Sequence, residues 1–156
     1  IANGLISTFE GRFKHHWLAG MRLKLGLFTE ESEDTALIQS LLDWMQQTKA
    51  DFTNTFRDLT QGRLEPAEWH LRWSERLKRQ PQSSNEVSEL MRRSNPAFIP
   101  RNHKVEEALA AASEQGDLNP MQRLLTVLTA PFDYTQDWPE FSEPSGLESY
   151  QTFCGT

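Results

Sequence analysis

Apolar residues spaced four apart dominate the first 25 residues of this chain. They are Leu5, Phe9, Phe13, Trp17, Met21 and Leu25. Residues four apart lie on the same face of an α-helix, so this spacing predicts one long amphipathic helix that ends at Gly26. Such a helix must bury its apolar face against other elements, and a face of this length exceeds what a short bundle covers. We therefore expect helical packing, and self-association of the isolated chain.

The rest of the sequence predicts further helices and no strands. Helical spacing or start signals mark six segments: one after the acidic cluster at residues 30–34, one from Asp51, one from Pro66, one over residues 87–94, one ending at Gly116 and one from Asn119. Three prolines disfavour regular structure after residue 130, although the aromatic residues there are expected to pack on the helices. The predicted fold class is all-α, with about seven helices in a bundle-like domain over residues 1–130 and an irregular tail over residues 131–156.

Composition and charge exclude several classes of protein. The apolar content of 37% can supply a core, and no apolar run approaches the roughly 20 residues of a membrane span. Net charge is −2 over residues 1–62, +4 over 63–104 and −8 over 105–156, which is a poor match for nucleic acid. The basic middle is expected to face an acidic surface of its own protein. We expect a cytoplasmic bacterial protein and, because the chain opens without Met, a piece of a longer one.

Three stretches resemble the selenoprotein O family. Residues 21–27 read Met-Arg-Leu-Lys-Leu-Gly-Leu and are similar to the family's Met-Arg-x-Lys-Leu-Gly-Leu. Residues 51–57 resemble its Asp-Tyr/Phe-Thr-x-x-Phe-Arg, and residues 95–102 resemble its Asn-Pro-x-aromatic-aliphatic-x-Arg-Asn. The stretches occur in the family's order, and the resemblance covers nearly all of the chain.

The resemblance implies a parent protein with a protein-kinase-like fold, a pseudokinase that transfers AMP rather than phosphate. It implies that the parent binds ATP with magnesium or manganese and modifies hydroxyl groups of protein substrates. The family's catalytic Lys–Glu pair, its metal-binding segment and its Asp-Tyr-Gly-Pro segment do not occur here, and no glycine-rich phosphate loop is present. We therefore assign no catalytic, nucleotide-binding or metal residue to this chain, and no cofactor.

Several polar and aromatic residues invite a functional interpretation that ordinary structure explains better. His15 and His16 point about 100° apart on a helix, so they cannot chelate a metal together. Arg22, Lys24 and Arg57 lie in family-like motifs and could contact a nucleotide phosphate, but structural ion pairs are the favoured interpretation.

Packing and capping explain the remaining candidates. The four-residue spacing within the aromatic set is first of all typical of core packing, and the basic run is typical of a solvated face that could alternatively dock the acidic tail. Asn102 is expected to cap the next helix while Arg101 anchors the preceding segment. The aromatic set is Phe52, Phe56, Trp69 and Trp73, and the basic run is Arg72, Arg76, Lys78 and Arg79.

Cys154 is the only cysteine, so an internal disulfide and a Cys-based zinc site are both excluded within this chain. It stands third from the end, where the family carries selenocysteine or Cys, and the resemblance implies redox control by pairing with another Cys of the parent. An inert surface thiol is the alternative.

The sequence therefore predicts the C-terminal helical region of a selenoprotein O-like protein adenylyltransferase, which supports the kinase-like core and carries a redox-active tail. Its main partner would be the rest of its own parent chain, with no nucleic acid and no membrane. The alternative is a free-standing helical interaction module whose basic face binds an acidic partner.

Overall fold

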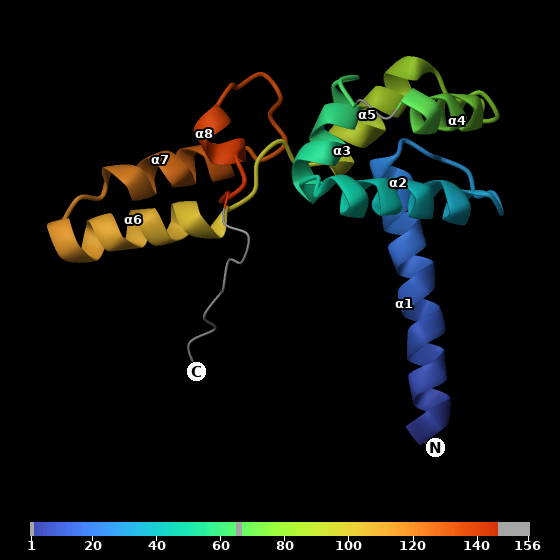
Figure 1. The fold of residues 1–156 in the computed structure, drawn as a ribbon, viewed down its shortest axis with the longest axis horizontal. Coiled ribbons are helices and arrows are strands. Elements are labelled where there is room, and N and C mark those ends of the chain that lie inside the picture. Colours follow the sequence, from blue (N-terminus) through green and yellow to red (C-terminus); the bar gives the residue numbers. More distant parts are fainter. Residues whose placement is uncertain (1, 65–66, 147–156) are drawn as a thin grey trace. The chain divides into compact units, whose positions relative to one another are not determined.

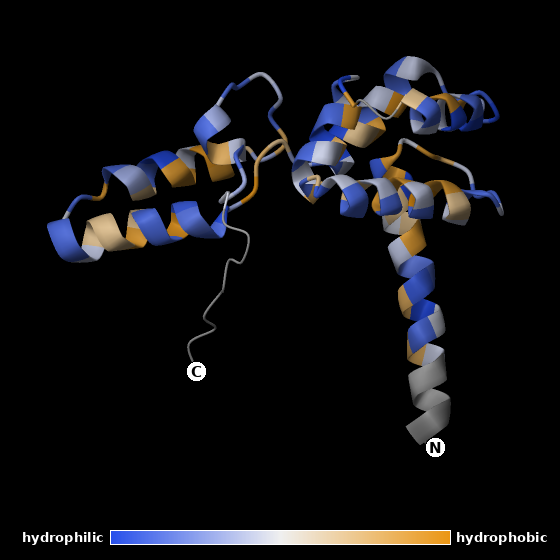
Figure 2. Cartoon of the chain, in the orientation of Figure 1, coloured by the Kyte–Doolittle hydropathy of each residue, from blue (hydrophilic) through white to orange (hydrophobic). Residues whose placement is uncertain are grey.

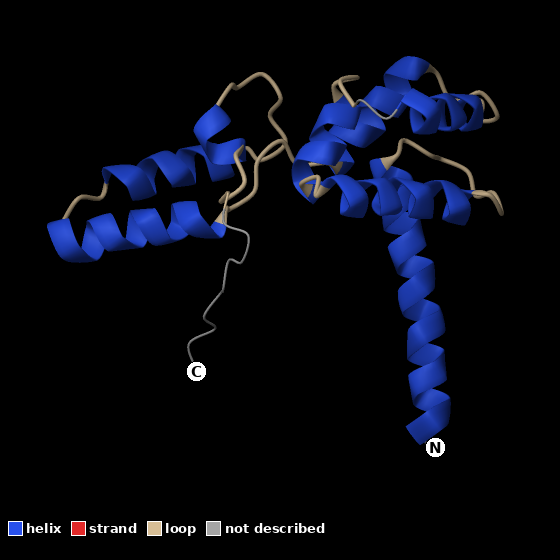
Figure 3. Cartoon of the chain, in the orientation of Figure 1, coloured by secondary structure: helices blue, strands red, loops and turns tan. Residues whose placement is uncertain are grey.

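The computed structural model describes residues 2–64 and 67–146, and side chains from Thr8 onward. These residues form helices and no strand, which confirms the all-α prediction (Figures 1 and 3). Residues 1–95 and 96–156 form two compact units. The helices are α1 (Ala2–Lys24), α2 (Asp34–Thr48), α3 (Phe52–Thr60), α4 (Ala67–Leu77), α5 (Ser84–Ser94), α6 (Asn102–Gln115), α7 (Asn119–Leu128) and α8 (Pro139–Ser142).

The first unit packs α1 to α5 around one apolar core. Helix α1 contacts α2 and α5, α2 contacts α4, and α3 contacts α5. In Figure 2 the apolar residues of these helices gather where the helices meet, and they also recur along the part of α1 that extends away from α2 to α5. The core includes Leu25, Ile38, Leu41, Phe56, Leu59, Trp69, Trp73, Val87 and Met91.

A glycine turn ends α1 and brings the chain against α5. Gly26 has φ +71°, and a Cβ atom built there would lie 2.7 Å from Cγ1 of Val87. The backbone N–H of Leu27 donates to the carbonyl of Arg22 at 2.9 Å, which closes the turn. Gly26 is thus required both for its left-handed backbone and for the close approach of Val87, and its predicted role as a helix stop is confirmed.

Side-chain caps fix the starts of α3 and α5. The carboxylate of Asp51 accepts a hydrogen bond from the backbone N–H of Asn54 at 2.8 Å, as expected for an N-cap. Ser83 and Glu86 form a capping box, in which each side chain accepts a hydrogen bond from the other residue's backbone N–H. Helix α2 begins at Asp34, the last residue of the acidic cluster rather than the residue after it, and ends at Thr48.

The second unit is an α6–α7 hairpin with the following segment folded onto it. The backbone N–H groups of Ala97 and Phe98 both donate to the carbonyl of Pro131. Gly116, with φ +68°, ends α6 as predicted. The core of this unit contains Ala97, Phe98, Ala108, Leu124, Val127 and Phe141, with Tyr134 and Trp138 packed against it.

Three details of the second unit differ from the expectations. Asn102 is the first residue of α6 and Arg101 occupies the N-cap position, so the prediction that Asn102 caps this helix is wrong. The tail contains the short helix α8, because Pro139 is accommodated in a first helical turn, where its missing N–H has no intrahelical partner to lose. Phe132 is 48% exposed, whereas Tyr134, Trp138 and Phe141 pack as expected. The expected domain boundary at residue 130 stays a prediction.

Candidate functional site

A buried charge cluster forms where α1, α2 and α4 meet. The carboxylate of Asp34, 0% exposed, accepts hydrogen bonds from Nε of Arg22 and from Nε of Arg76, each at 2.7 Å. It also accepts one from the backbone N–H of Glu31 at 2.9 Å. Glu30 pairs with Arg22 at 2.9 Å, and Glu31 pairs with Arg76 at 3.2 Å. The cluster ties three helices together through one carboxylate.

The electrostatics of this cluster favour the ionised form of Asp34. Burial by itself would raise the pKa of the carboxyl group, but the hydrogen bonds from Arg76, from the backbone of Glu31 and from Arg22 outweigh it and hold the pKa below its ordinary value. The charges are therefore satisfied within the chain. Arg22 and Arg76 hold helices together and present no free guanidinium to a phosphate.

The expectation of a solvated basic face on α4 is wrong for one residue. Arg76 is 2% exposed, and its Nη2 donates to the backbone carbonyl of Thr29 at 2.7 Å. Arg79 is exposed but pairs with Glu31 at 2.7 Å and with Glu33 at 2.9 Å. Arg72 and Lys78 remain on the surface. The burial of Arg76 follows from Asp34 and Thr29, which lie more than 40 residues earlier in the sequence.

Lys24 and Asn95 join α1 to the end of α5. The ammonium group of Lys24 donates to the carbonyl of Ser94 at 3.0 Å and lies 5.4 Å from the ring centre of Phe56. Asn95, 0% exposed, donates through Nδ2 to the carbonyl of Lys24 at 2.8 Å and to Oγ1 of Thr60 at 2.9 Å. Burial lowers the pKa of Lys24. The sequence pattern gave no sign of this role for Asn95, because its partners lie 35 and 71 residues away.

The aromatic residues of α4 are core residues, as expected. Trp69 and Trp73 stack with ring centres 6.0 Å apart, and their indole N–H groups donate to the carbonyls of Leu37 and Leu25, both at 2.9 Å. Phe56 is buried, but Phe52 is 45% exposed beside it, so the core interpretation holds for three of the four residues.

The N-terminal part of α1 carries an uncovered apolar face. Phe9 is 70% exposed, Phe13 59% and Trp17 37%, although they continue the face that Met21 and Leu25 bury in the core. The rings of Phe9 and Phe13 stack with centres 6.3 Å apart. Figure 1 shows this part of α1, in blue, extending beyond the other helices of its unit. Three large side chains in one row define a surface that suits an apolar partner.

The remaining predicted residues form no binding site in the described part of the chain. His15 and His16 are both exposed on α1, in agreement with the sequence interpretation. The described residues contain no group of three His, Cys, Asp or Glu side chains that could hold a metal ion. Arg101 does anchor its segment, because its Nη2 donates to the carbonyl of Ser142 at 2.9 Å. Cys154 lies outside the described residues, and its redox role stays a prediction.

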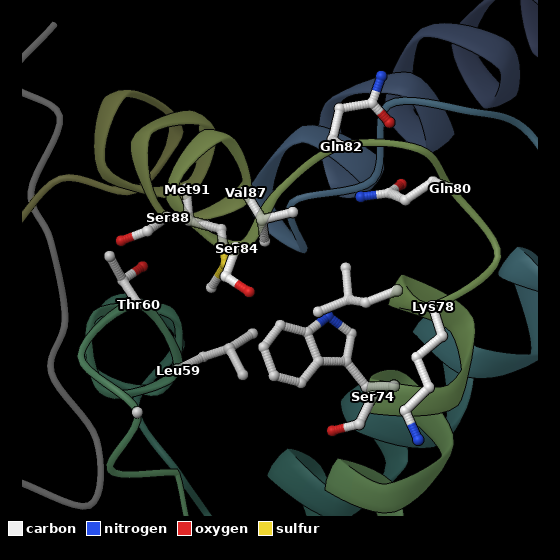
Figure 4. A pocket seen from close by; sticks show the side chains of 13 residues that line it. Leu59, Thr60, Ser74, Lys78, Gln80, Gln82, Ser84, Val87, Ser88 and Met91 are labelled. Atoms are coloured by element: carbon white, nitrogen blue, oxygen red, sulfur yellow. The ribbon is translucent and has the colours of Figure 1, made fainter.

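An open pocket lies between α3, α4 and α5 (Figure 4). Its volume is about 460 Å³. Apolar side chains from all three helices form its floor, and serines, glutamines and one lysine surround them. No sequence motif marks this pocket, because its residues are dispersed from position 59 to position 91.

The fold and these clusters together define an all-helical region whose buried polar groups connect its own helices and whose longest helix presents an apolar face. None of the helices that are described has the length and apolar character needed to cross a membrane. Comparison with known proteins shows which family this region is similar to.

The profile of the family described as "Protein adenylyltransferase SelO" matches residues 2–67. Proteins named "Protein nucleotidyltransferase YdiU" are similar over the whole chain: 50% identical in Halalkalibacterium halodurans, 47% in Brevibacillus brevis and 48% in Anoxybacillus flavithermus. In each case the match covers 100% of this chain and 34% of the relative. The chain is therefore similar to the selenoprotein O family, as its motifs indicated, and spans about a third of the length of these relatives.

Proposed function

We propose that this chain is a non-catalytic helical region of a protein adenylyltransferase, and that it supports the part of the full-length protein that carries the chemistry. The full-length protein would transfer AMP from ATP to hydroxyl groups of proteins. The identity of about half over the whole chain to nucleotidyltransferases supports this proposal.

We infer that ATP and its divalent metal bind outside the described part of this chain. No metal-ligand cluster occurs in its described part, and carboxylates of the chain itself neutralise Arg22, Arg76 and Arg79. The nucleotide and its magnesium or manganese would be held elsewhere in the full-length protein. The supporting role is carried by one observation, the exposed row formed by Phe9, Phe13 and Trp17. This row would pack against the remaining two thirds of the full-length protein, since burying large apolar side chains stabilises an interface.

The proposal is tested by comparing the full-length protein with this chain. Incubation with labelled ATP, Mg²⁺ or Mn²⁺ and protein substrates should label protein only when the full-length protein is present. In the full-length protein, Phe13→Asp should lower both the thermal midpoint of unfolding and the rate of AMP transfer. It places a charge in the row of Phe9, Phe13 and Trp17, which is proposed to be buried there. Lys14→Asp places the same charge one residue away on another face and serves as the control. Labelling by this chain alone, or equal effects of both substitutions, would contradict the proposal.

The C-terminal Cys154 is proposed to regulate the full-length protein by forming a disulfide with a cysteine outside this chain. Comparing AMP transfer by the full-length protein and its Cys154→Ser variant, with and without dithiol reductant, tests this role. The redox response should disappear in the variant, and an unchanged response would assign it to other groups.

The alternative of a free-standing interaction module finds little support in the basic face. Arg76 is buried, and Arg79 pairs with Glu31 and Glu33. Two of the four basic residues in the run from Arg72 to Arg79 are therefore engaged by acidic residues of the chain itself.

A further inference from the structure

The pocket between α3, α4 and α5 has a rigid aromatic floor. The indole N–H of Trp73 donates to the carbonyl of Leu25 at 2.9 Å, which fixes the ring, and the ring also stacks on Trp69. Gln80 spans the turn after α1, because its Nε2 donates to the carbonyl of Gly26 and its Oε1 accepts from the backbone N–H of Phe28. The floor is thus formed before any ligand arrives, so binding requires little ordering.

Apolar side chains around Trp73 complete the floor. Leu59 comes from α3, Leu77 from α4, and Val87 and Met91 from α5. Val87 is held in place by the glycine turn that touches it. Figure 4 shows the labelled side chains of Leu59 and Val87, which come from two different helices and line the same pocket as Trp73. The apolar lining that aromatic ligands prefer is thus present, although each of these side chains exposes only a small edge to the pocket: Trp73 is 8% exposed and Val87 7%.

The charge at the rim of the pocket favours an anionic ligand over a cationic one. Lys78 is the single ionisable residue among the side chains that line the pocket, and no carboxylate is among them. Its ammonium group pairs with Glu75 at 2.6 Å, but both side chains are about two-thirds exposed. An exposed pair of this kind contributes little and exchanges readily, so an incoming carboxylate can compete for the lysine. A cationic ligand would meet repulsion from Lys78 and no carboxylate among the lining side chains.

The rim also offers neutral hydrogen-bonding groups. Ser84 and Ser88 on α5 and Ser74 on α4 are among the residues that line the pocket, and their side chains are labelled in Figure 4. A hydroxyl both donates and accepts, so these groups can hydrogen-bond a carboxylate or a ring N–H. With its volume of about 460 Å³, the pocket is of a size typical of small-molecule sites.

We propose that this pocket binds a small aromatic carboxylate, with the ring on the Trp73 floor and the carboxylate at Lys78. This site is independent of AMP transfer, and its failure would leave the proposed function untouched.

Three indole compounds that differ in charge test the proposal on the 156-residue chain. Indole-3-acetate, indole and tryptamine are titrated by calorimetry and by ¹H–¹⁵N spectra, in which the indole N–H signal of Trp73 should shift. Indole-3-acetate should bind about tenfold more tightly than tryptamine, with indole between them. No binding of indole-3-acetate at millimolar concentration, or equal affinity for the acetate and the amine, would overturn the proposal.

Two substitutions locate the binding. Ser88→Leu adds bulk inside the pocket and should weaken indole-3-acetate and indole alike, by about tenfold. Lys78→Gln, at an exposed position that folding tolerates, should reduce the affinity for indole-3-acetate to that for indole. Ser113→Leu and Lys49→Gln make the same changes at exposed positions outside the pocket and should have no effect. Binding that Ser88→Leu and Lys78→Gln leave unchanged would place the ligand elsewhere and refute the assignment.

Discussion

Replacing Asp34 by Asn should lower the free energy of unfolding of the first unit by more than an isosteric substitution on the surface does. The substitution keeps the shape of the side chain but removes the charge that accepts hydrogen bonds from Arg22, Arg76 and the backbone of Glu31. Removing one partner of a buried ion pair costs about 3–5 kcal/mol, because the other partner stays buried without compensation. Here Arg22 keeps Glu30 and Arg76 keeps Glu31, so we expect the lower end, about 3 kcal/mol.

Urea denaturation followed by tryptophan fluorescence measures this loss. With a slope of about 2 kcal/mol per molar urea, a loss of about 3 kcal/mol lowers the midpoint by about 1.5 M. Asp43→Asn is the matched control, since Asp43 lies on the same helix, is exposed and accepts a hydrogen bond from Gln39. The reasoning is refuted if Asp34→Asn shifts the midpoint no further than Asp43→Asn.

The same carboxylate makes stability depend on pH. The folded pKa of Asp34 is depressed, so its contribution is fully present above the unfolded pKa of about 3.9 and is lost as pH falls through the folded pKa. The native protein should therefore lose more stability than Asp34→Asn when the urea series is repeated at acidic pH. A constant difference between the two proteins at every pH would show that the carboxylate is not the source.

Three further outcomes can be measured. Gly26→Ala should lower the free energy of unfolding by about 3 kcal/mol in the urea series, because it strains a left-handed backbone and places a Cβ atom against Val87. Gly62 also has a positive φ, +70°, but open space surrounds it, so Gly62→Ala should cost only about 1 kcal/mol. Under oxidant, the chain should form disulfide-linked dimers that Cys154→Ser abolishes on a non-reducing gel, since no second thiol exists for an internal bridge. Light scattering should show concentration-dependent self-association of the chain that Phe13→Asp reduces, and a monomer at all concentrations would contradict it.

Local patterns predicted most helix bounds because the signals for those bounds lie close together in the sequence. Asp51 caps α3 three residues from its hydrogen-bond partner, and Gly26 and Gly116 end helices through their own backbone conformation. Such features depend on a few neighbouring residues, so reading the sequence is sufficient to find them.

Features that depend on distant partners could not be predicted in this way. Arg76 belongs to the same basic run as Arg72 and Arg79 and was therefore expected to be solvated, yet it is buried against Asp34, which lies 42 residues earlier. In the sequence, Asn95 stands out only as the residue before a proline. In the structure, its side chain connects α1, α3 and α5. A single sequence contains the partners of these residues but no sign of which distant residues meet.

The exposed part of α1 has a consequence for the exchange of its backbone amides with solvent. Between Thr8 and Trp17 every side chain is exposed, so the helix there is held by its own backbone hydrogen bonds without tertiary packing. Amides in this stretch should exchange quickly and those near Leu25 slowly, giving a gradient of protection along one continuous helix. In the full-length protein the gradient should flatten wherever a partner surface covers Phe9 and Phe13. Hydrogen exchange along α1 would then map the edge of that surface residue by residue.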